Sequence, residues 1–227
     1  CPGPITFILK KKKKSKISKI ATAGKKTVAV RIPKHKAARN LLSIIKFPLA
    51  APSANISSKL SPTSAKDVFE EFGNKIKFIL DGGQCKIGLE STIIDLTVKP
   101  TILRPGSISA EKIQKILKKK ITINNNPKKI KGPGQLKLHY SPGIPIIMNR
   151  KYPEKNQALV GFGKKFKRGK NNFNLSKNGS LKEAANNLYK IMRKIKKRNF
   201  KSIAVTQIPN IELGRAINDR LIKASNK

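Results

Sequence analysis

The stretches FPLAAPSANISSKLSPT, residues 47–63, and ILDGGQCKIGLESTIIDLTVKPTILRPG, residues 79–106, decide the fold of this chain. In the first stretch a short apolar run ends in a polar turn at residues 52–55, and a second turn at residues 61–63 opens an amphipathic helix. In the second stretch a tight loop at residues 88–92 leads into a β-branched strand. Loops that place hydroxyls and backbone N–H groups at strand ends are typical of α/β proteins that hold phosphate-bearing ligands.

Apolar spacing along the rest of the chain predicts alternating strands and helices. The predicted strands are residues 4–9, 27–32, 76–80, 91–96, 144–148, 157–160 and 203–206. The predicted helices are residues 36–45, 63–72, 110–117, 181–197 and 214–224. We expect the helix 63–72 to be capped at Ser61 or Thr63, to hold a proline in its first turn and to end before Gly73. This alternation indicates a mixed α/β sheet, then a linker and a second, smaller α/β domain.

Composition sets the outer limits. The 227 residues allow one large or two small domains, and a hydrophobic content of 38% is enough for a core. No apolar run approaches the length of a membrane span, and no signal peptide is visible. The two cysteines, Cys1 and Cys85, lack metal-ligand spacing, which favours a reducing compartment and a cytoplasmic location.

The formal net charge of +40 is the most extreme property of the composition. Clustered lysines favour contact with nucleic-acid phosphates. The excess is mostly lysine, however, and it comes with abundant isoleucine and asparagine, a combination that an AT-rich genome favours. The run Lys10–Lys14 is interpreted as a surface loop. The charge therefore leaves RNA contact open without defining the function.

Several motifs, in order along the chain, resemble the YrdC-like domain of the Sua5/YrdC/YciO family. They are TVAVRIP (27–33), PLAAPSANISSKLSPT (48–63), ILDGG (79–83), GLEST (88–92) and LRPG (103–106). The linker GPGQLKLHYSP (132–142) and the later GRAINDRL (214–221) resemble the longer, two-domain Sua5 type of threonylcarbamoyl-AMP synthase. The resemblance implies a YrdC-like twisted mixed sheet with helices in residues 1–118. A linker at 119–143 and a small Rossmann-like α/β Sua5 domain at 144–227 would follow.

The function that this resemblance implies is nucleotidyl transfer. The enzyme would join L-threonine, bicarbonate and ATP into L-threonylcarbamoyladenylate with release of pyrophosphate. The adenylate would serve the formation of N6-threonylcarbamoyladenosine (t6A) at position 37 of tRNA. Expected partners are the three substrates and a tRNA threonylcarbamoyl-transferase complex, with direct contact to tRNA left open, but no membrane.

The resemblance also implies the binding residues. Those expected to bind ATP are Thr27, Ser53, Asn55, Ser61, Arg104 and Tyr140. Those expected to bind threonine are Arg31, Ala51 and Ser91. The guanidinium of Arg31 suits the carboxylate of threonine, because it can donate two parallel hydrogen bonds. Each residue also has a plain structural interpretation, as a strand former, a turn residue, a helix cap or, for Tyr140, a packing aromatic.

No residue is assigned as a catalytic acid, base or nucleophile. The sequence has two histidines, His35 and His139, and no Ser/His/Asp constellation stands out. Joining ATP and a carbamate in a mixed anhydride depends on positioning and on neutralising phosphates more than on a protein nucleophile. The expected cofactor is Mg²⁺ bound through ATP phosphates and water, so no metal ligand is assigned.

One part of the family pattern has no match here. The family carries an upstream stretch with a PTET- or PTDTYGL-like strand and a Lys/Arg pair that contacts the nucleotide phosphates. Because the chain also begins with Cys1 rather than Met, we expect it to lack an N-terminal part. Residues 1–227 alone are then expected to be inactive and poorly soluble, since loss of a central strand exposes unpaired edges.

Two other interpretations remain. The first is a basic RNA-binding or ribosome-associated module without enzymatic activity. Such a module would profit from exposed aromatics for base stacking, and the aromatic content is only 5% with no tryptophan. The second is a carbamoyltransferase-type domain from a larger hydrogenase-maturation chain, which the Sua5-like tail and the absence of zinc-finger cysteines disfavour.

Overall fold

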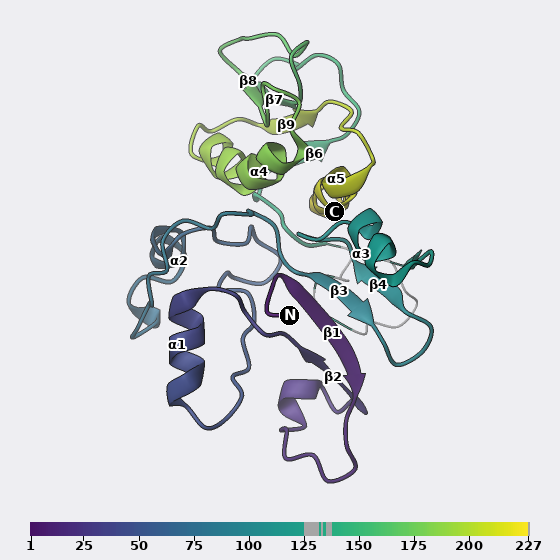
Figure 1. Cartoon of the computed structure of the whole chain (residues 1–227). Helices are drawn as coiled ribbons and strands as arrows, with labels where there is room; N and C mark the ends of the chain where they lie inside the picture. Colours follow the sequence, from purple (N-terminus) through teal and green to yellow (C-terminus); the bar gives the residue numbers. More distant parts are fainter. Residues whose placement is uncertain (125–131, 133, 135–137, 227) are drawn as a thin grey trace. The chain divides into compact units, whose positions relative to one another are not determined.

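The computed structural model describes residues 1–124, 132, 134 and 138–226, and the chain divides into two compact units. Unit 1 comprises Cys1–Pro52 and Glu90–Gln135, and unit 2 comprises Ser53–Leu89 and Leu136–Lys227. Each unit is therefore assembled from two separate stretches of sequence. Figure 1 labels the elements of both units.

Unit 1 contains a mixed five-stranded sheet in the order β2-β1-β3-β4-β5. Its strands are β1 (Ile5–Lys10), β2 (Thr27–Val30), β3 (Thr92–Asp95), β4 (Thr101–Arg104) and β5 (Thr122–Ile123). β1 runs antiparallel to β2 and parallel to β3, β3 is antiparallel to β4, and β4 is parallel to β5. Since Ile5 lies opposite Thr92, the first strand of the chain pairs with the strand that begins at the last residue of the GLEST motif.

Side chains that alternate along these strands form a core on each face of the sheet. On one face Ile94 and Ile102 pack with Ile113 of α3 (Ala110–Leu117). On the other face Ile8, Ile93 and Leu103 pack together, which completes the two-sided burial of β3. The helix α3 begins at Ser109, whose hydroxyl accepts a hydrogen bond from the Lys112 amide.

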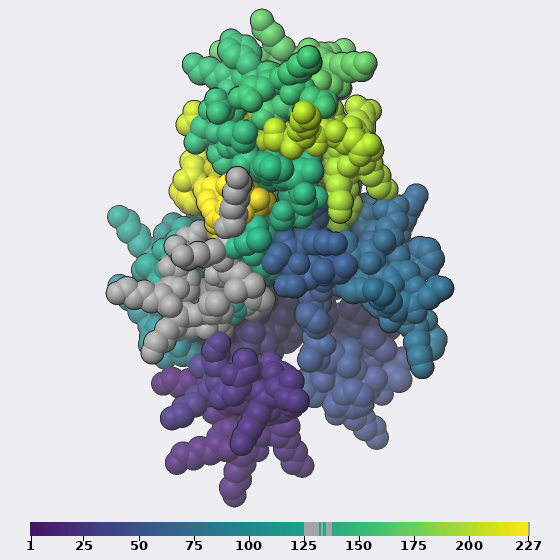
Figure 2. Space-filling view, turned by 180° about the vertical axis from the view of Figure 1, so that it is seen from behind, coloured from purple at the N-terminus to yellow at the C-terminus, as the bar shows by residue number. Residues whose placement is uncertain are grey.

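The periphery of unit 1 is polar and basic. The lysine run begins at the last residue of β1 and continues into the β1–β2 connection, which holds the 3₁₀ turn η1 (Ile20–Thr22). Lys12–Lys14 are exposed, and long side chains of this purple segment project into solvent in Figure 2. The amphipathic helix α1 (Lys36–Ile44) forms as predicted, although none of its residues is buried.

Unit 2 begins with two turns and the helix α2 (Ala65–Phe72), which the 3₁₀ turn η2 (Gly73–Lys75) follows. The cap of α2 is Ser64, whose hydroxyl accepts from the Asp67 amide, so the predicted caps at Ser61 and Thr63 are wrong. Pro62 consequently precedes the cap and lies outside the first turn. The residue before a proline favours extended backbone, which keeps the helix from starting at Ser61. The predicted end is confirmed, because Gly73 follows the last turn with φ 52°.

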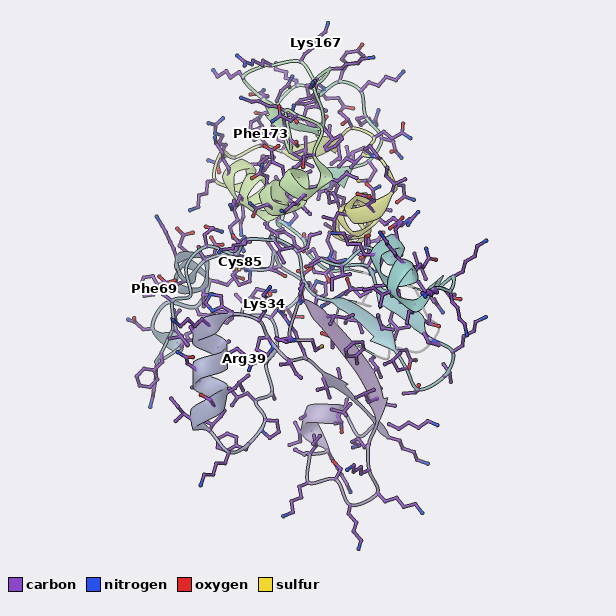
Figure 3. The ribbon with its side chains drawn as sticks, in the orientation of Figure 1. Lys34, Arg39, Phe69, Cys85, Lys167 and Phe173 are labelled. Atoms are coloured by element: carbon purple, nitrogen blue, oxygen red, sulfur yellow. The ribbon has the colours of Figure 1, made fainter. Side chains whose placement is uncertain are left out.

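The second part of unit 2 is a four-stranded parallel sheet in the order β6-β9-β7-β8. Its strands are β6 (Ile146–Ile147), β7 (Gln157–Gly161), β8 (Asn172–Asn174) and β9 (Ser202–Val205). The helices α4 (Leu181–Lys196) and α5 (Glu212–Ser225) pack side by side against it in Figure 1, and apolar residues from both join its core. Phe173 of β8, labelled in Figure 3, is buried in this core.

The helix α4 has the clearest local determinants. Ser180 accepts from the Glu183 amide, and the Glu183 carboxylate accepts from the Ser176 hydroxyl at 2.6 Å. Arg193, Lys194 and Lys196 lie in its last turn, where cations oppose the negative end of the helix dipole. These signals explain why sequence spacing located this helix within one residue.

The mixed α/β class is confirmed, with two local differences. The predicted strand 76–80 does not form, and its residue Phe78 is 89% exposed. Its β-propensity favours extended backbone, but a strand also needs a neighbour for its hydrogen bonds. The short strands β4, β5 and β8 were not predicted. Much of the predicted linker 119–143, namely residues 125–131, 133 and 135–137, lies outside the described residues.

Within the described residues, no helix combines the length and the apolar character that a membrane crossing requires.

Candidate functional site

A buried cluster at the start of β3 joins two of the predicted binding residues. Arg104, the last residue of β4, donates from Nε and Nη2 to the Ser91 carbonyl at 3.1 and 2.9 Å. Its Nη2 also lies 3.1 Å from the Ser91 hydroxyl, which is 2.7 Å from the Thr6 hydroxyl of β1. Ser91, Arg104 and Thr6 are 4%, 7% and 8% exposed. Two strands and the residue that precedes β3 thus bring two hydroxyls and a guanidinium to one buried point.

Among the described residues, the charge of Arg104 has no carboxylate counter-ion. Removing a cation from water is costly unless an opposite charge or hydrogen bonds compensate it. The cluster is therefore a place where an anionic group would be stabilised.

The loop that precedes β3 is held tightly against the loop that follows β4. The Ser107 amide and hydroxyl both donate to the Glu90 carbonyl, at 3.0 and 2.9 Å. The Thr92 hydroxyl donates to the Ile108 carbonyl at 2.6 Å and accepts from the Ile108 amide at 2.9 Å. A Cβ atom on Gly106 would lie 2.5 Å from the Glu90 carbonyl oxygen, so only glycine fits there. These contacts fix the backbone that carries Ser91.

Arg31 lies near the same end of the sheet. It follows β2, is exposed, and donates from Nε to the Gly3 carbonyl at 3.3 Å. The neighbouring Pro4 carbonyl accepts from the Thr92 amide, so the segment that enters β1 borders both Arg31 and the start of β3. The sheet thus brings Arg31 and Ser91 to one end, as a shared threonine site requires.

The other predicted residues of unit 1 are placed differently. Thr27 pairs with Lys10 at the opposite end of β2, and a strand of this length separates its ends by about 10 Å. Thr27 is consequently not brought together with Ser91. Ala51 lies exposed, outside any helix or strand, near the end of the first stretch of unit 1.

In unit 2 the predicted residues Ser53 and Asn55 form a turn. The Ser53 carbonyl accepts from the Asn55 amide, and the Asn55 side chain donates to the carbonyls of Ile56 at 2.7 Å and Lys59 at 3.2 Å. The Asn55 Oδ1 atom is buried and has no hydrogen-bond partner among the described residues. The turn is thus closed by the amide group of Asn55.

The turn around Ser61 is organised by an ion pair. Asp67 Oδ2 accepts from the Thr63 amide at 2.7 Å and the Thr63 hydroxyl at 2.9 Å, and it lies 3.5 Å from Arg193 Nη1. Burial alone would raise the pKa of Asp67, but the Thr63 hydrogen bonds, the Arg193 charge and Ser64 together lower it. Asp67 is therefore held as a carboxylate.

The second terminal nitrogen of the Arg193 guanidinium contacts the turn around Ser61 directly. This nitrogen, Nη2, donates to the carbonyls of Leu60 at 3.1 Å and Ser61 at 2.8 Å. Ser61 itself is 7% exposed. The nucleotide-binding position predicted at Ser61 is thus fixed by a side chain of α4.

Tyr140 lies in the core of unit 2. It is 2% exposed, has a φ of 63°, and stacks on Tyr189 of α4 with ring centroids 6.2 Å apart. Arg220 of α5 lies over its ring, 4.9 Å from the centroid. Packing, the plain interpretation of this residue, is what the described contacts show, and its predicted contact with ATP remains a prediction. Its neighbour His139 donates from its amide to the Lys223 carbonyl at 3.2 Å.

Buried ionic groups of α5 support this segment. Asp219 pairs with Arg220 at 2.7 Å and with Lys223 at 2.8 Å. Asp219 and Arg220 lie in the GRAINDRL motif, but no role was predicted for them, and sequence spacing gave no signal for Lys223, Thr6 or Arg193. Asp67 could have been found, because a hydroxyl residue three positions before an acidic one marks a helix start.

The described residues contain no group of three or more His, Cys, Asp or Glu side chains that could hold a metal ion. The donors gathered around Ser91 and Arg104 are hydroxyls and a cation, which suit anionic ligands.

Comparison with known proteins finds a matching family model for each half of the chain. The Sua5_yciO_yrdC family model (Telomere recombination) matches residues 1–106. The model of the Threonylcarbamoyl-AMP synthase C-terminal domain matches residues 108–226.

Individual relatives cover nearly the whole chain. A threonylcarbamoyl-AMP synthase of Pyrococcus abyssi is 36% identical over 99% of this chain and 71% of its own length. The Bacillus subtilis protein of that name is 32% identical over 99% of this chain and 70% of its own length.

Solved structures agree with this result and confirm the expected fold. The crystal structure of P. abyssi Sua5 complexed with L-threonine has a TM-score of 0.87 at 36% identity, covering 99% of this chain and 71% of that one. A P. abyssi variant with a histidine and a tyrosine replaced by alanine has a TM-score of 0.83 at 34% identity, with 99% and 70% covered. With family models on both halves and relatives aligned along its length, the chain belongs to the Sua5/YrdC/YciO family, in its two-domain Sua5 form.

Proposed function

We propose that this protein makes L-threonylcarbamoyladenylate from L-threonine, bicarbonate and ATP, with release of pyrophosphate. The observation that carries the proposal is the buried Arg104 guanidinium, held by Ser91 without a carboxylate partner among the described residues. Two similar proteins bear the name threonylcarbamoyl-AMP synthase, and one was crystallised with L-threonine. As a nucleotidyltransferase, the protein would supply the donor for t6A formation in tRNA and act before a transferase complex.

The amino-acid half of the reaction is assigned to unit 1. Arg31 would bind the threonine carboxylate and Ser91 would lie beside the amino acid, with Ala51 along the same site. The threonine amine and bicarbonate form a carbamate and water, which leaves a new carboxylate that must be oriented toward ATP. A rigid loop suits this task, because misplacement of a reacting group by about 1 Å can cost 100-fold in rate. The contacts of Gly106 and Ser107 supply that rigidity.

The nucleotide half is assigned to Thr27, Ser53, Asn55, Ser61, Arg104 and Tyr140. The carbamate oxygen attacks the α-phosphorus, the bond to the β-phosphate oxygen breaks, and pyrophosphate leaves. The protein needs no nucleophile for this exchange, but it must neutralise developing charge. Arg104 is a suitable cation, and the turns at Asn55 and Ser61 offer polar groups near phosphates.

We propose that Mg²⁺ enters with ATP and is held by phosphate oxygens and water, since the described residues offer no carboxylate cluster for it. Its charge would offset that of the phosphates.

The direct test is pyrophosphate release by the protein that carries this chain. Release should require L-threonine, bicarbonate and ATP together, and omission of any one should reduce it to background. L-serine in place of threonine serves as the specificity control. Pyrophosphate release that is indifferent to threonine would reject the proposal.

A second candidate property is contact with RNA through unit 2. Between Glu154 and Glu183 the sequence has no acidic residue, and the loop 163–170 carries Lys164, Lys165, Lys167, Arg168 and Lys170. These five side chains are exposed, and Lys167 points into solvent in Figure 3. Replacing all five with glutamine should lower the affinity for tRNA and make that affinity less dependent on salt concentration. Unchanged retention would exclude this loop as the contact.

A further inference from the structure

One face of α4 contacts three of the segments that carry predicted binding residues. Positions 185, 189 and 193 are spaced by four residues, so their side chains follow one stripe of the helix. At position 189 the tyrosine stacks on Tyr140. At position 193 the arginine binds the carbonyls of Leu60 and Ser61.

The third contact is made by the backbone. A Cβ atom on Gly88 would lie 2.6 Å from the Ala185 carbonyl oxygen and 2.6 Å from the Asn186 Cα atom. Gly88 also has a φ of 72°, which a side chain would strain. The GLEST motif therefore begins on the surface of α4. A helix from the C-terminal half of the chain is thus the common support of three loops.

Arg193 is the most specific of these contacts. A guanidinium has a fixed planar fork, so it can bind two adjacent carbonyls and still face Asp67. Asp67 in turn holds the Thr63 amide and hydroxyl. Arg193 therefore binds the start of the turn, at Leu60 and Ser61, and Asp67 binds its end, at Thr63. The side chains of Arg193 and Asp67 are each only 15% exposed, so the pair is largely shielded from water.

We propose that Arg193 is a positioning residue for nucleotide binding, acting through the Leu60 and Ser61 carbonyls. The inference rests on the proposed function, because it takes Ser61 as part of the ATP site. It assigns the C-terminal half of the chain a defined task, which is to set the geometry of the turn that receives the nucleotide. Threonine binding, assigned to unit 1, does not depend on this contact.

The experiment compares three variants of the protein that carries this chain. Arg193→Met keeps the length of the stem and removes every donor. Arg193→Lys restores the charge without the fork. Lys197→Met is the matched control, because Lys197 lies four residues after Arg193, at the C-terminal cap of α4, and forms an exposed pair with Glu70 at 2.9 Å.

Two readouts are measured on each variant: KM for ATP and for threonine, and hydrogen–deuterium exchange of the peptide that spans residues 58–64. Arg193→Met should raise KM for ATP on the order of 10- to 100-fold and leave KM for threonine within about twofold. Its 58–64 amides should exchange faster. Arg193→Lys should fall between Arg193→Met and wild type, and Lys197→Met should match wild type in both readouts.

The outcomes separate this inference from the proposed function. Unchanged exchange in Arg193→Met would overturn the inference whatever the enzyme does. Faster exchange with an unchanged KM for ATP, or equal loss of ATP and threonine affinity, would overturn it as well, since the contact would then be merely structural. A wild-type protein that releases no threonine-dependent pyrophosphate would overturn the proposed function. Exchange at 58–64 would still show whether Arg193 fixes the turn.

Discussion

Arg104 binds both the carbonyl and the hydroxyl of Ser91, although the two residues come from different strands. These hydrogen bonds join the last residue of β4 to the residue that precedes β3. The guanidinium of Arg104, with its positive charge, is buried there. Ser91 is oriented by this cation on one side and by the Thr6 hydroxyl on the other. A substrate that carries a negative charge would meet a site whose polar groups are already aligned.

Replacing Arg104 with lysine should impair both stability and activity. A lysine cannot reproduce the forked contact with the Ser91 carbonyl, so at least one buried hydrogen bond is lost. Loss of such a bond costs about 1–3 kcal/mol in the free energy of unfolding. We expect a lower Tm and threonine-dependent pyrophosphate release reduced by at least about 10-fold. Wild-type values in both measurements would contradict the assignment of Arg104 to the site.

Replacing Arg31 with alanine should weaken threonine binding and spare the fold. The residue is exposed, so few packing contacts are lost, whereas a hydrogen bond to a charged carboxylate is worth about 1.5–3 kcal/mol. Isothermal titration with L-threonine measures this loss. Arg39→Ala, which removes an exposed arginine of α1, is the control and should bind threonine normally. Equal affinity of the two variants would reject the role of Arg31.

Replacing Gly106 with alanine should destabilise unit 1. The new methyl group would lie 2.5 Å from the Glu90 carbonyl oxygen and 2.6 Å from the Thr92 amide nitrogen, and both are backbone atoms that cannot rotate away. Overpacking of this kind costs about 1–3 kcal/mol. Gly3→Ala is the matched control, because a Cβ there meets no atom within 4 Å. Urea unfolding should show a lower midpoint only for Gly106→Ala.

Replacing Asp67 with asparagine should lower stability at neutral pH and change its pH dependence. The pKa of Asp67 is below its ordinary value of 3.8, so the carboxylate stabilises the folded state above that value. That contribution disappears as pH falls through the lowered pKa. The difference in Tm between wild type and Asp67→Asn should therefore be large at pH 7 and shrink below about pH 4. A difference that stays constant over this range would show that the charge of Asp67 is not responsible.

Local signals were sufficient for much of the fold. The helix α4 was predicted as residues 181–197 and observed as Leu181–Lys196, because its cap at Ser180 and its apolar stripe both lie within one stretch of sequence. The strand predicted at 76–80 failed for the opposite reason. Its residues prefer extended backbone, but whether they join a sheet depends on a partner strand elsewhere in the chain.

The candidate site was likewise predicted only where local sequence carries the signal. The hydroxyl-bearing turns at Ser53 and Ser61 were visible as motifs, and Ser91 and Arg104 proved to be in contact. Arg193 was not visible, since it lies 132 residues after Ser61 in the sequence and no spacing rule joins them. Thr6 was missed likewise, because a threonine in a strand is more often a strand former than a ligand group. Contacts between residues that are far apart in the sequence can be identified only once the fold is known.

The division of the chain into units that each combine two stretches has a practical consequence for genetics and engineering. The polypeptide crosses between the units three times, near residues 52, 89 and 135, whereas the family models meet at residues 106 and 108. A gene cut at that boundary would deprive α2 and the Ser61 turn of the helix that carries Arg193. Exchanging C-terminal halves between relatives would likewise pair loops from one parent with a support from another. The two halves must therefore be inherited together as a matched set.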